Sequence, residues 1–423
     1  MEIMKITGGK KLYGDVSVCS AKNAVLPILA CCLLCDGEVK LRNCAPLGDV
    51  LDMLKIVSAY GVKSRFEGSD IILDGRNVKK SEADCAVTGR IRSSVFILGP
   101  LIGRLGEACV SYPGGCDIGL RPIDLHIYGL GKLGVKVTEE NGKIVCDGKE
   151  LSGGEIVFDF PSVGATENAI MAAATAKGRT LIRNAAREPE IADLAKFINA
   201  CGGKVYGAGG DVITVDGVES LSGCEFTPVP DRIIGGTFLA AVATAGGDVF
   251  IRNLDSSLVS GVIEKFSAAG ADITRDGNGT RITVRERLRA VAKIETQPYS
   301  GFPTDMQAQT VAALSTAIGT SVMVENLFEN RFGYTKELNK MGARIEVKDR
   351  VAVVRGVRRL RGTSVEARDL RGGAALIVAA LGADGESIIS GLSHVDRGYF
   401  GFERDLALLG AEAIRKRKSG GSV

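Results

Sequence analysis

Six apolar stretches, spaced roughly 70 residues apart, dominate the pattern of hydrophobic and polar positions along the chain. Apolar residues are almost continuous within each stretch, which is typical of a buried helix. A shorter segment rich in Val, Ile or Leu, such as Val39–Asn43 or Val249–Asn253, follows and predicts a strand. The six stretches are Leu26–Leu34, Val95–Ile102, Ala169–Ala176, Phe238–Ala245, Thr310–Ile318 and Ala374–Ala380.

A second signature repeats with the same period. A glycine, a small residue and a polar residue close a further helical stretch and open a further strand in every repeat. Each module therefore reads helix, strand, helix, strand, strand, and the predicted fold class is α/β. The six glycines of this signature are Gly61, Gly134, Gly202, Gly270, Gly342 and Gly410.

The sixth module reaches the C-terminus with only one of its closing strands. The segment Ile6–Val16 resembles Cys146–Ile156, which lies where the second module closes. We therefore expect the first residues of the chain to complete the last module, and the simplest grouping is three modules in each of two domains. The expected domains are residues 22–229, which carry the loop around Cys116, and a discontinuous C-terminal domain of residues 1–21 plus 230–423.

Composition narrows the possible partners and the compartment. The chain has 423 residues and a net charge of +3, from 53 basic and 50 acidic residues, so no strong field attracts nucleic acid. The basic run Arg415–Lys418 is expected to be a solvated tail. No apolar stretch has membrane-spanning length, and Met1–Tyr13 lacks the apolar core of a signal peptide. We expect a cytoplasmic protein that binds neither nucleic acid nor membrane.

The eleven cysteines are expected to be free thiols in a reducing compartment. Cys32 and Cys35 form a C-x-x-C motif with no second pair in the sequence, and the chain has only two histidines. A zinc site is therefore not expected, and neither a metal nor a cofactor is predicted. The G-x-G-x-x-G match at Gly129–Gly134 ends a helix instead of following a strand, so it is not interpreted as a dinucleotide loop.

One cysteine stands apart from the apolar stretches. Cys116 follows Gly114 and Gly115, which favour an irregular loop. Arg121 would lower the thiol pKa, since a nearby cation stabilises the thiolate. We therefore interpret Cys116 as an exposed and reactive thiol, against the alternative that it is an ordinary small core residue.

Basic residues return at equivalent places in the modules. Lys22, Arg92 and Arg371 precede or open apolar helices, whose N-termini carry partial positive charge. Arg121, Arg331 and Arg397 lie on the loops that follow. A single arginine of this kind would be interpreted as a solvated surface residue. The repeated set instead predicts a site for a small ligand with several negative charges, such as phosphate plus carboxylate.

Asp305 interrupts this series of basic residues. It is interpreted either as a helix N-cap or as a base that removes a proton from a hydroxyl inside a cationic site. Pro161–Thr166 offers hydroxyl and backbone N–H groups at another helix start, which suits a phosphate or a nucleobase.

These residues resemble the enolpyruvyl transferase family, and within it the UDP-N-acetylglucosamine 1-carboxyvinyltransferases, along essentially the whole chain. The motifs that carry the resemblance are Ala21–Pro27, Pro113–Gly119, Arg121–Leu125, Ser162–Thr166, Arg187–Glu190, Pro303–Gln309, Phe328–Phe332, Asp369–Arg371 and Asp396–Tyr399.

The resemblance implies a fold and an activity. The fold is a two-domain, inside-out α/β barrel in which each domain has three βαβαββ repeats in a pseudo-threefold arrangement, with the active site in the interdomain cleft. The activity is transfer of the enolpyruvyl group of phosphoenolpyruvate to the 3′-hydroxyl of UDP-N-acetylglucosamine with release of phosphate. This reaction is the first committed step of peptidoglycan precursor synthesis, and hence belongs to cell wall biogenesis, and it needs no cofactor.

The resemblance also implies residue roles. Cys116 would protonate C3 of phosphoenolpyruvate and be the target of fosfomycin, and Asp305 would deprotonate the sugar hydroxyl. Lys22, Arg121 and the catalytic Arg397 would hold phosphoenolpyruvate, with Arg331 and Arg371 nearby. The contacts implied for UDP-N-acetylglucosamine are Asn23, Arg92, Arg121, Pro122, Ile123, Asp124, Leu125, Ser162, Val163, Gly164, Asp305 and Leu327. Some family members carry Lys at the position of Phe160, so one charge contact to the diphosphate is expected to be missing.

Two other functions stay open at this point. The first is 3-phosphoshikimate 1-carboxyvinyltransferase, with the same fold and reaction type, against which the Cys116 loop and Lys22-Asn23 argue. The second is a catalytically silent paralogue that binds the nucleotide sugar as a regulator. Whichever of these functions the protein has, we expect it to be a monomer or a weak homo-oligomer.

Overall fold

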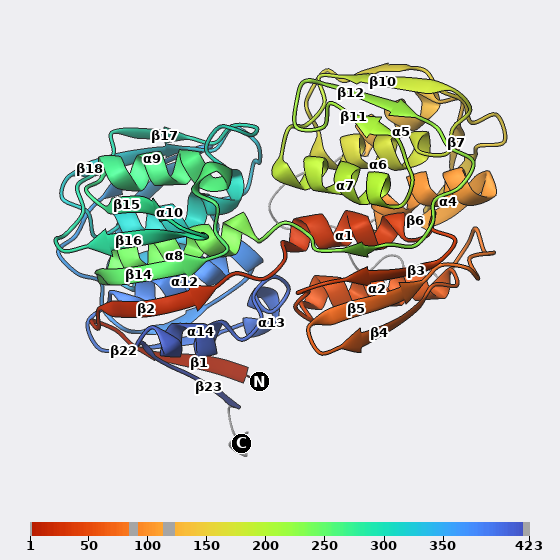
Figure 1. Ribbon diagram of the computed structural model, residues 1–423. Coiled ribbons are helices and arrows are strands. Elements are labelled where there is room, and N and C mark those ends of the chain that lie inside the picture. The colour runs from red at the N-terminus through yellow and green to blue at the C-terminus, as the bar shows by residue number, and fades with distance from the viewer. Residues whose placement is uncertain (1, 84–91, 113–122, 418–423) are drawn as a thin grey trace. The chain divides into compact units, whose positions relative to one another are not determined.

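The computed structural model describes residues 2–83, 92–112 and 123–417 (Figure 1). The described residues form two compact units. Residues 2–19 and 230–417 make up the C-terminal unit, and the described residues from 20 to 229 make up the N-terminal unit. Each unit contains three small sheets, so that one sheet corresponds to each of the six modules.

The fifth module shows the plan of every module except the second, whose described strands form a three-stranded sheet without a leading strand. A leading strand pairs in parallel with the strand after the apolar helix, and the two closing strands add antiparallel pairs in the order β17-β18-β20-β19. The leading strand completes the βαβαββ unit that the family resemblance implied. The elements are β17 (Lys293–Glu295), η3 (Thr304–Met306), α10 (Gln307–Leu314), β18 (Thr320–Val324), α11 (Thr335–Lys340), β19 (Arg344–Lys348) and β20 (Val351–Arg355).

The first strand of the chain fills the gap in the sixth module. β1 (Glu2–Thr7) lies between β22 and β23 and pairs antiparallel with both, with Met4 opposite Ile389 on one side and Arg415 on the other.

The basic run that begins at Arg415 is therefore part of a strand as far as Arg417. The expectation of a solvated tail was wrong for these residues. Pairing with β1 and the ion pairs of Arg415 with Glu2 and Asp396 hold it in the sheet. The elements are β21 (Ser364–Glu366), α12 (Leu370–Leu381), β22 (Glu386–Ser390), α13 (Leu392–Val395), α14 (Phe402–Leu408) and β23 (Glu412–Arg417).

The second strand of the chain leads the fourth module. β2 (Leu12–Ser17) runs parallel to β14, which follows the apolar helix α8. The other elements of this module are α8 (Arg232–Ala245), β14 (Gly247–Arg252), η2 (Ser256–Val259), α9 (Ser260–Ala268), β15 (Asp272–Asp276) and β16 (Gly279–Val284).

The N-terminal unit repeats the plan, with sheet orders β13-β3-β5-β4, β6-β8-β7 and β11-β12-β10-β9. Its first module is α1 (Lys22–Cys31), β3 (Glu38–Leu41), α2 (Gly48–Ala59), β4 (Lys63–Glu67) and β5 (Asp70–Asp74), led by β13 (Glu225–Phe226). Its second is η1 (Arg92–Ile97), α4 (Leu98–Leu105), β6 (Glu107–Ser111), α5 (Asp124–Lys132), β7 (Lys136–Glu140) and β8 (Lys143–Asp147). Its third is β9 (Glu155–Val157), α6 (Val163–Ala173), β10 (Arg179–Arg183), α7 (Pro189–Ala200), β11 (Val205–Tyr206) and β12 (Val212–Asp216).

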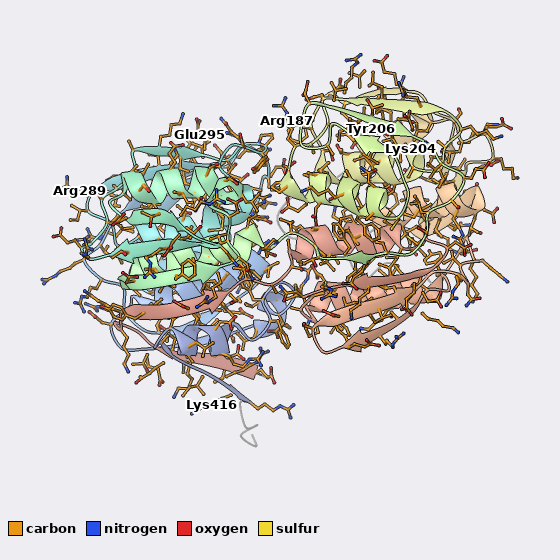
Figure 2. The ribbon with its side chains drawn as sticks, in the orientation of Figure 1. Arg187, Lys204, Tyr206, Arg289, Glu295 and Lys416 are labelled. Carbon is orange, nitrogen blue, oxygen red and sulfur yellow. The ribbon has the colours of Figure 1, made fainter. Side chains whose placement is uncertain are left out.

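The apolar helices occupy the interior of each unit, and the sheets lie outside them. In the C-terminal unit α8, α10 and α12 contact one another, and nearly all their residues are buried (Figure 1). This explains why their sequences are apolar all round, while the strands alternate buried and exposed positions. Charged side chains such as Lys204 and Arg289 project from the outer surfaces of the units (Figure 2). The α/β class is confirmed; in the described residues the sheets stay separate and do not close into a continuous barrel.

The six repeated glycines have a common conformation. All six have positive φ angles, between 84° at Gly134 and 115° at Gly61. A Cβ atom at Gly61 would also lie 2.4 Å from the carbonyl oxygen of Asn77. Glycine is favoured at these helix-to-strand junctions because it adopts positive φ without a steric penalty.

Candidate active site

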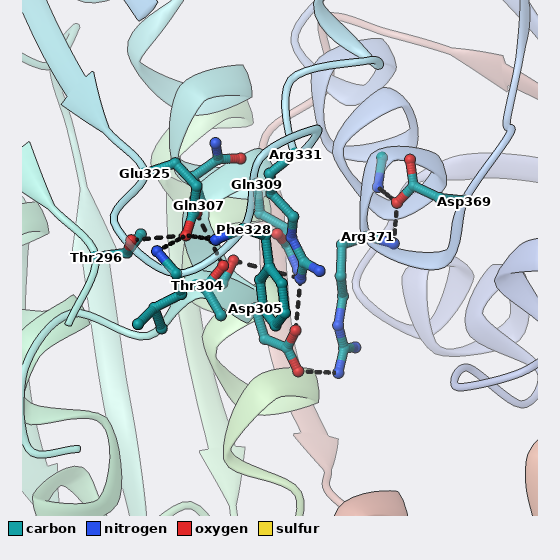
Figure 3. Close-up of polar contacts among 12 residues, drawn as sticks. Thr296, Thr304, Asp305, Gln307, Gln309, Glu325, Phe328, Arg331, Asp369 and Arg371 are labelled. Atoms are coloured by element: carbon teal, nitrogen blue, oxygen red, sulfur yellow. Dashed lines mark hydrogen bonds and ion pairs between the residues drawn. The ribbon is translucent and has the colours of Figure 1, made fainter. Parts of the chain in front are cut away.

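The side chain of Asp305 joins two arginines from different modules in the C-terminal unit (Figure 3). Its Oδ1 accepts a hydrogen bond from Arg331 Nη2 at 2.6 Å, and its Oδ2 accepts one from Arg371 Nη2 at 2.8 Å. No side-chain cap bond is formed at the start of α10, so the N-cap interpretation of Asp305 was wrong. Two guanidinium groups against one carboxylate leave a net positive charge, which favours an anionic ligand.

Both arginines are buried, with only 6 % of each side chain exposed. Asp369 caps α12 by accepting from the backbone N–H groups of Arg371 and Gly372 at 3.0 and 2.8 Å, which fixes Arg371 at the helix start. Burial alone would lower the pKa of Arg371, but the Asp305 carboxylate raises it above its ordinary value. Arg371 is therefore a permanent cation. The guanidinium carbon of Arg331 lies 5.4 Å from the ring centroid of Phe328.

Glu325 was not predicted from the sequence, yet it organises the segments beside Asp305. It follows β18 and is fully buried. Its Oε2 accepts from the hydroxyl of Thr304 at 2.8 Å, and its Oε1 accepts from the hydroxyl of Thr296 and the backbone N–H of Leu327, both at 2.9 Å (Figure 3). Leu327 is one of the implied nucleotide-sugar contacts. The only available signal was an acidic residue directly after a buried strand.

Lys22 is the first residue of α1 and belongs to the N-terminal unit. Its Nζ lies 2.9 Å from Oδ2 of Asp49, in the first turn of α2, and both side chains are buried. Asn23, the next residue of the implied site, is half-buried. Asp49 was not predicted, because its position in the first turn of a helix has an ordinary explanation in the helix dipole.

The start of α6 also lies where the repeats predicted a helix start. Ser162 is its N-cap, and its Oγ accepts from the backbone N–H of Ala165 at 3.4 Å. A Cβ atom at Gly164 would lie 3.0 Å from Cε1 of His126, so a side chain at this position would crowd the imidazole ring. Val163 is the first residue of the helix.

His126 is a buried residue that the sequence did not single out. Burial, with the nearby charge of Arg92 as a second cause, lowers the pKa of His126 to about 3. The ring is therefore neutral, and its Nδ1 accepts from the side-chain amide of Asn168 at 3.1 Å, which leaves the proton on Nε2. Arg92 itself opens η1, as the repeats predicted.

The other predicted residues are placed as follows. Ile123 is buried, Leu125 is half-buried and Asp124 is exposed at the start of α5. Arg397 is half-buried between α13 and α14, and Phe160 is exposed. Cys116, Arg121 and Pro122 lie outside the described residues.

The C-x-x-C motif gains neighbours that the sequence did not place beside it. Sγ of Cys201 lies 3.8 Å from Sγ of Cys35 and 3.4 Å from Sγ of Cys224. Burial raises the pKa of Cys31 and Cys32, which lie in the same cluster, and buried neutral thiols are unreactive. No group of three or more His, Cys, Asp or Glu residues in the described part of the chain could hold a metal ion.

The fold matches that of enolpyruvyl transferases of known structure. The enolpyruvyl transferase NikO from Streptomyces tendae superposes with a TM-score of 0.87, at 22% identity over 98% of each chain. An EPSP synthase from Acinetobacter baumannii superposes with a TM-score of 0.75, at 17% identity over 99% of this chain and 100% of that one. At these identities the likeness establishes the fold.

Sequence comparison identifies the family as well as the fold. A family model described as EPSP synthase (3-phosphoshikimate 1-carboxyvinyltransferase) matches residues 6–406, so the chain belongs to this family of enolpyruvyl transferases. UDP-N-acetylglucosamine 1-carboxyvinyltransferase 2 of Caldanaerobacter subterraneus subsp. tengcongensis is 48% identical over 97% of this chain and 99% of its own. The protein of the same name from Carboxydothermus hydrogenoformans is 44% identical over 98% of this chain and 99% of its own. None of the helices in the described ranges is long and apolar enough to cross a membrane.

Proposed function

We propose that this enzyme transfers the enolpyruvyl group of phosphoenolpyruvate to the 3′-hydroxyl of UDP-N-acetylglucosamine, with release of phosphate. The observation that carries the proposal is the Asp305 carboxylate held between two buried arginines, in a chain 48% identical to a relative with this name. A carboxylate beside fixed cations can act as a base toward a hydroxyl while the cations bind an anionic co-substrate.

The first step forms a bond between the sugar oxygen and C2 of phosphoenolpyruvate. Asp305 takes the hydroxyl proton, and C3 gains a proton, for which Cys116 is the proposed donor. In the second step the bond from C2 to the phosphate oxygen breaks, phosphate leaves with the bonding electrons, and C3 loses a proton, which restores the C2=C3 double bond and gives the enol ether product. Arg331 and Arg371 stabilise the negative charge of the phosphate and carboxylate groups throughout.

The remaining roles follow the family resemblance and form part of the proposal. Lys22, Arg121 and Arg397 are assigned to phosphoenolpyruvate, and the start of α6 at Ser162–Gly164 is assigned to the nucleotide sugar. Lys22 is suited to this because it is a buried ammonium group at a helix N-terminus. We also propose that the reaction serves peptidoglycan precursor synthesis in the cytoplasm, and that the protein is a monomer or a weak homo-oligomer.

Phosphate release with two acceptors tests the proposal. Phosphoenolpyruvate with UDP-N-acetylglucosamine is expected to release phosphate, and phosphoenolpyruvate with shikimate 3-phosphate is expected to release none above background. The opposite acceptor preference would make the chain a 3-phosphoshikimate 1-carboxyvinyltransferase. Binding of the nucleotide sugar without turnover would indicate a regulatory paralogue.

A further inference from the structure

A buried hydroxyl network lies behind Arg371 in the C-terminal unit. Tyr399 follows α13, is 2 % exposed, and packs against Phe402 with a ring-centroid distance of 4.9 Å and an angle of 37° between the rings. Its hydroxyl group lies 2.8 Å from Oγ1 of Thr237 on α8, and 3.4 Å from both Nε2 of Gln309 on α10 and Nη1 of Arg371 on α12. One phenol therefore contacts all three central helices of the unit.

The hydrogen-bond directions in this network can be assigned from the contacts of Thr237. Thr237 uses its only hydroxyl proton to donate to the carbonyl oxygen of Ile233 at 2.8 Å, so toward Tyr399 it can only accept. Tyr399 must therefore donate to Thr237, and its oxygen is left to accept from Gln309 and Arg371, whose nitrogen atoms are donors. The phenol thus presents its lone pairs, and never its proton, to the guanidinium group.

Tyr399 therefore contacts Arg371 through the guanidinium nitrogen atom that is not used in the ion pair with Asp305. Arg371 uses Nη2 to hold Oδ2 of Asp305 at 2.8 Å and Nη1 to contact Tyr399 (Figure 3 shows the Asp305 side). Both nitrogen atoms belong to one rigid plane, so fixing Nη1 also fixes Nη2. The network is buried, and water is not available to replace the phenol oxygen as an acceptor.

We propose that Tyr399 is a positioning residue of the reaction: oriented by Thr237, it fixes the guanidinium plane of Arg371 and through it the carboxylate of Asp305. This inference rests on the proposed function, in which Asp305 is the base. Displacement of the base by a fraction of an ångström lowers the rate of the reaction before it weakens substrate binding.

The substitution Tyr399→Phe removes the hydroxyl group and keeps the ring that packs on Phe402. We expect kcat to fall about tenfold, in line with the loss of a long hydrogen bond to a charged group, with the KM for UDP-N-acetylglucosamine changed less than about twofold. The matched control is Tyr334→Phe, which removes another buried phenol, one that donates to Gln307 Oε1 at 2.9 Å and makes no bond to Arg371. A similar loss of thermal stability with unchanged kcat is expected for the control. Equal kcat values for the two variants would overturn the proposal.

Thr237 supplies a second test that does not alter the phenol. Thr237→Val removes the acceptor that orients the Tyr399 proton, and kcat is expected to fall several-fold, whereas Thr237→Ser keeps the hydroxyl and should restore it. If valine and serine give the same kcat, the orienting role of Thr237 is wrong and so is the proposal.

A crystal structure of Tyr399→Phe separates this inference from the proposed function. If the wild-type protein releases no phosphate with either acceptor, the proposed function fails, but the structural question is still answered. Displacement of Arg371 Nη2 from Asp305 in the variant would support the positioning role. An unchanged contact between Arg371 and Asp305 would overturn it.

Discussion

Replacement of Glu325 is expected to weaken the C-terminal unit and the active site together. The carboxylate is fully buried and accepts four hydrogen bonds, from two threonine hydroxyls and from the backbone N–H groups of Leu327 and Phe328. At about 1 kcal/mol net for each bond, Glu325→Ala should lower the free energy of unfolding by about 4 kcal/mol. Glu325→Gln retains an oxygen acceptor and should cost about 1–2 kcal/mol, through loss of the charge and of the bond that Thr304 donates.

The assay is hydrogen exchange followed by mass spectrometry in increasing urea, because it reports on each unit separately in a chain without tryptophan. Glu329→Ala is the matched control. Glu329 pairs with Arg350 at 2.6 Å, but the two side chains are 46% and 43% exposed, so a loss below about 1 kcal/mol is expected. Thr304 directly precedes Asp305, and Glu325→Ala should therefore also lower kcat at least tenfold. Equal stability of Glu325→Ala and Glu329→Ala would refute the reasoning.

Three further predictions use other parts of the chain. Asp305→Asn should lower the rate of phosphate release by about a hundredfold or more, since an amide cannot accept the hydroxyl proton, and a rate near that of the wild type would exclude Asp305 as the base. Burial raises the pKa of Asp193 to about 6 from 3.8, so the folded state binds this proton more tightly and its contribution to stability is lost as the pH rises between these values. Asp193→Asn should reduce the difference in unfolding free energy between pH 4 and pH 7 by at most about 3 kcal/mol, and an unchanged difference in urea unfolding would contradict this. Iodoacetamide at pH 7 should label Cys116 before any of the nine described thiols, which mass spectrometry of timed digests would check; burial raises the pKa of Cys19 and Cys146, for example, to about 12.

The sequence predicted the positions of helix starts well, because the repeat fixes them independently of propensity. Lys22 opens α1, Arg92 opens η1 and Ser162 caps α6, as the module register required. The acidic and basic candidates for the site were likewise proposed by type and position. Their pairing was not, because a one-dimensional period does not say which of several arginines meets the aspartate. That Asp305 contacts Arg331 and Arg371 depends on the packing of two modules.

Buried acidic and aromatic residues were the main functional residues that the sequence did not predict. Glu325 and Asp49 are charged residues, and charged residues are usually exposed, so their burial could not be predicted without the partners that compensate it. Tyr399 belonged to a recognised motif, but its role depends on Thr237 and Gln309, which lie on helices from two other modules. Contacts of this kind arise only when three distant helices pack together.

The packing of the central helices gives a physical reason for an aspartate among the basic helix starts. Arg232 opens α8, Asp305 lies in η3 directly before α10, and Arg371 lies in the first turn of α12. These three α-helices contact one another. A basic residue at all three positions would bring buried guanidinium groups together beside helix N-termini that are already positive, which is unfavourable in a low-dielectric interior. A carboxylate at position 305 compensates two buried cations and still leaves an excess of positive charge. The residue that permits the cations to be buried is thus also the one proposed to accept the proton. Stability and catalysis at position 305 should therefore be coupled: Asp305→Ala is expected to lose more stability than Asp305→Asn, whose amide oxygen can still accept from one arginine, although both variants lose the base.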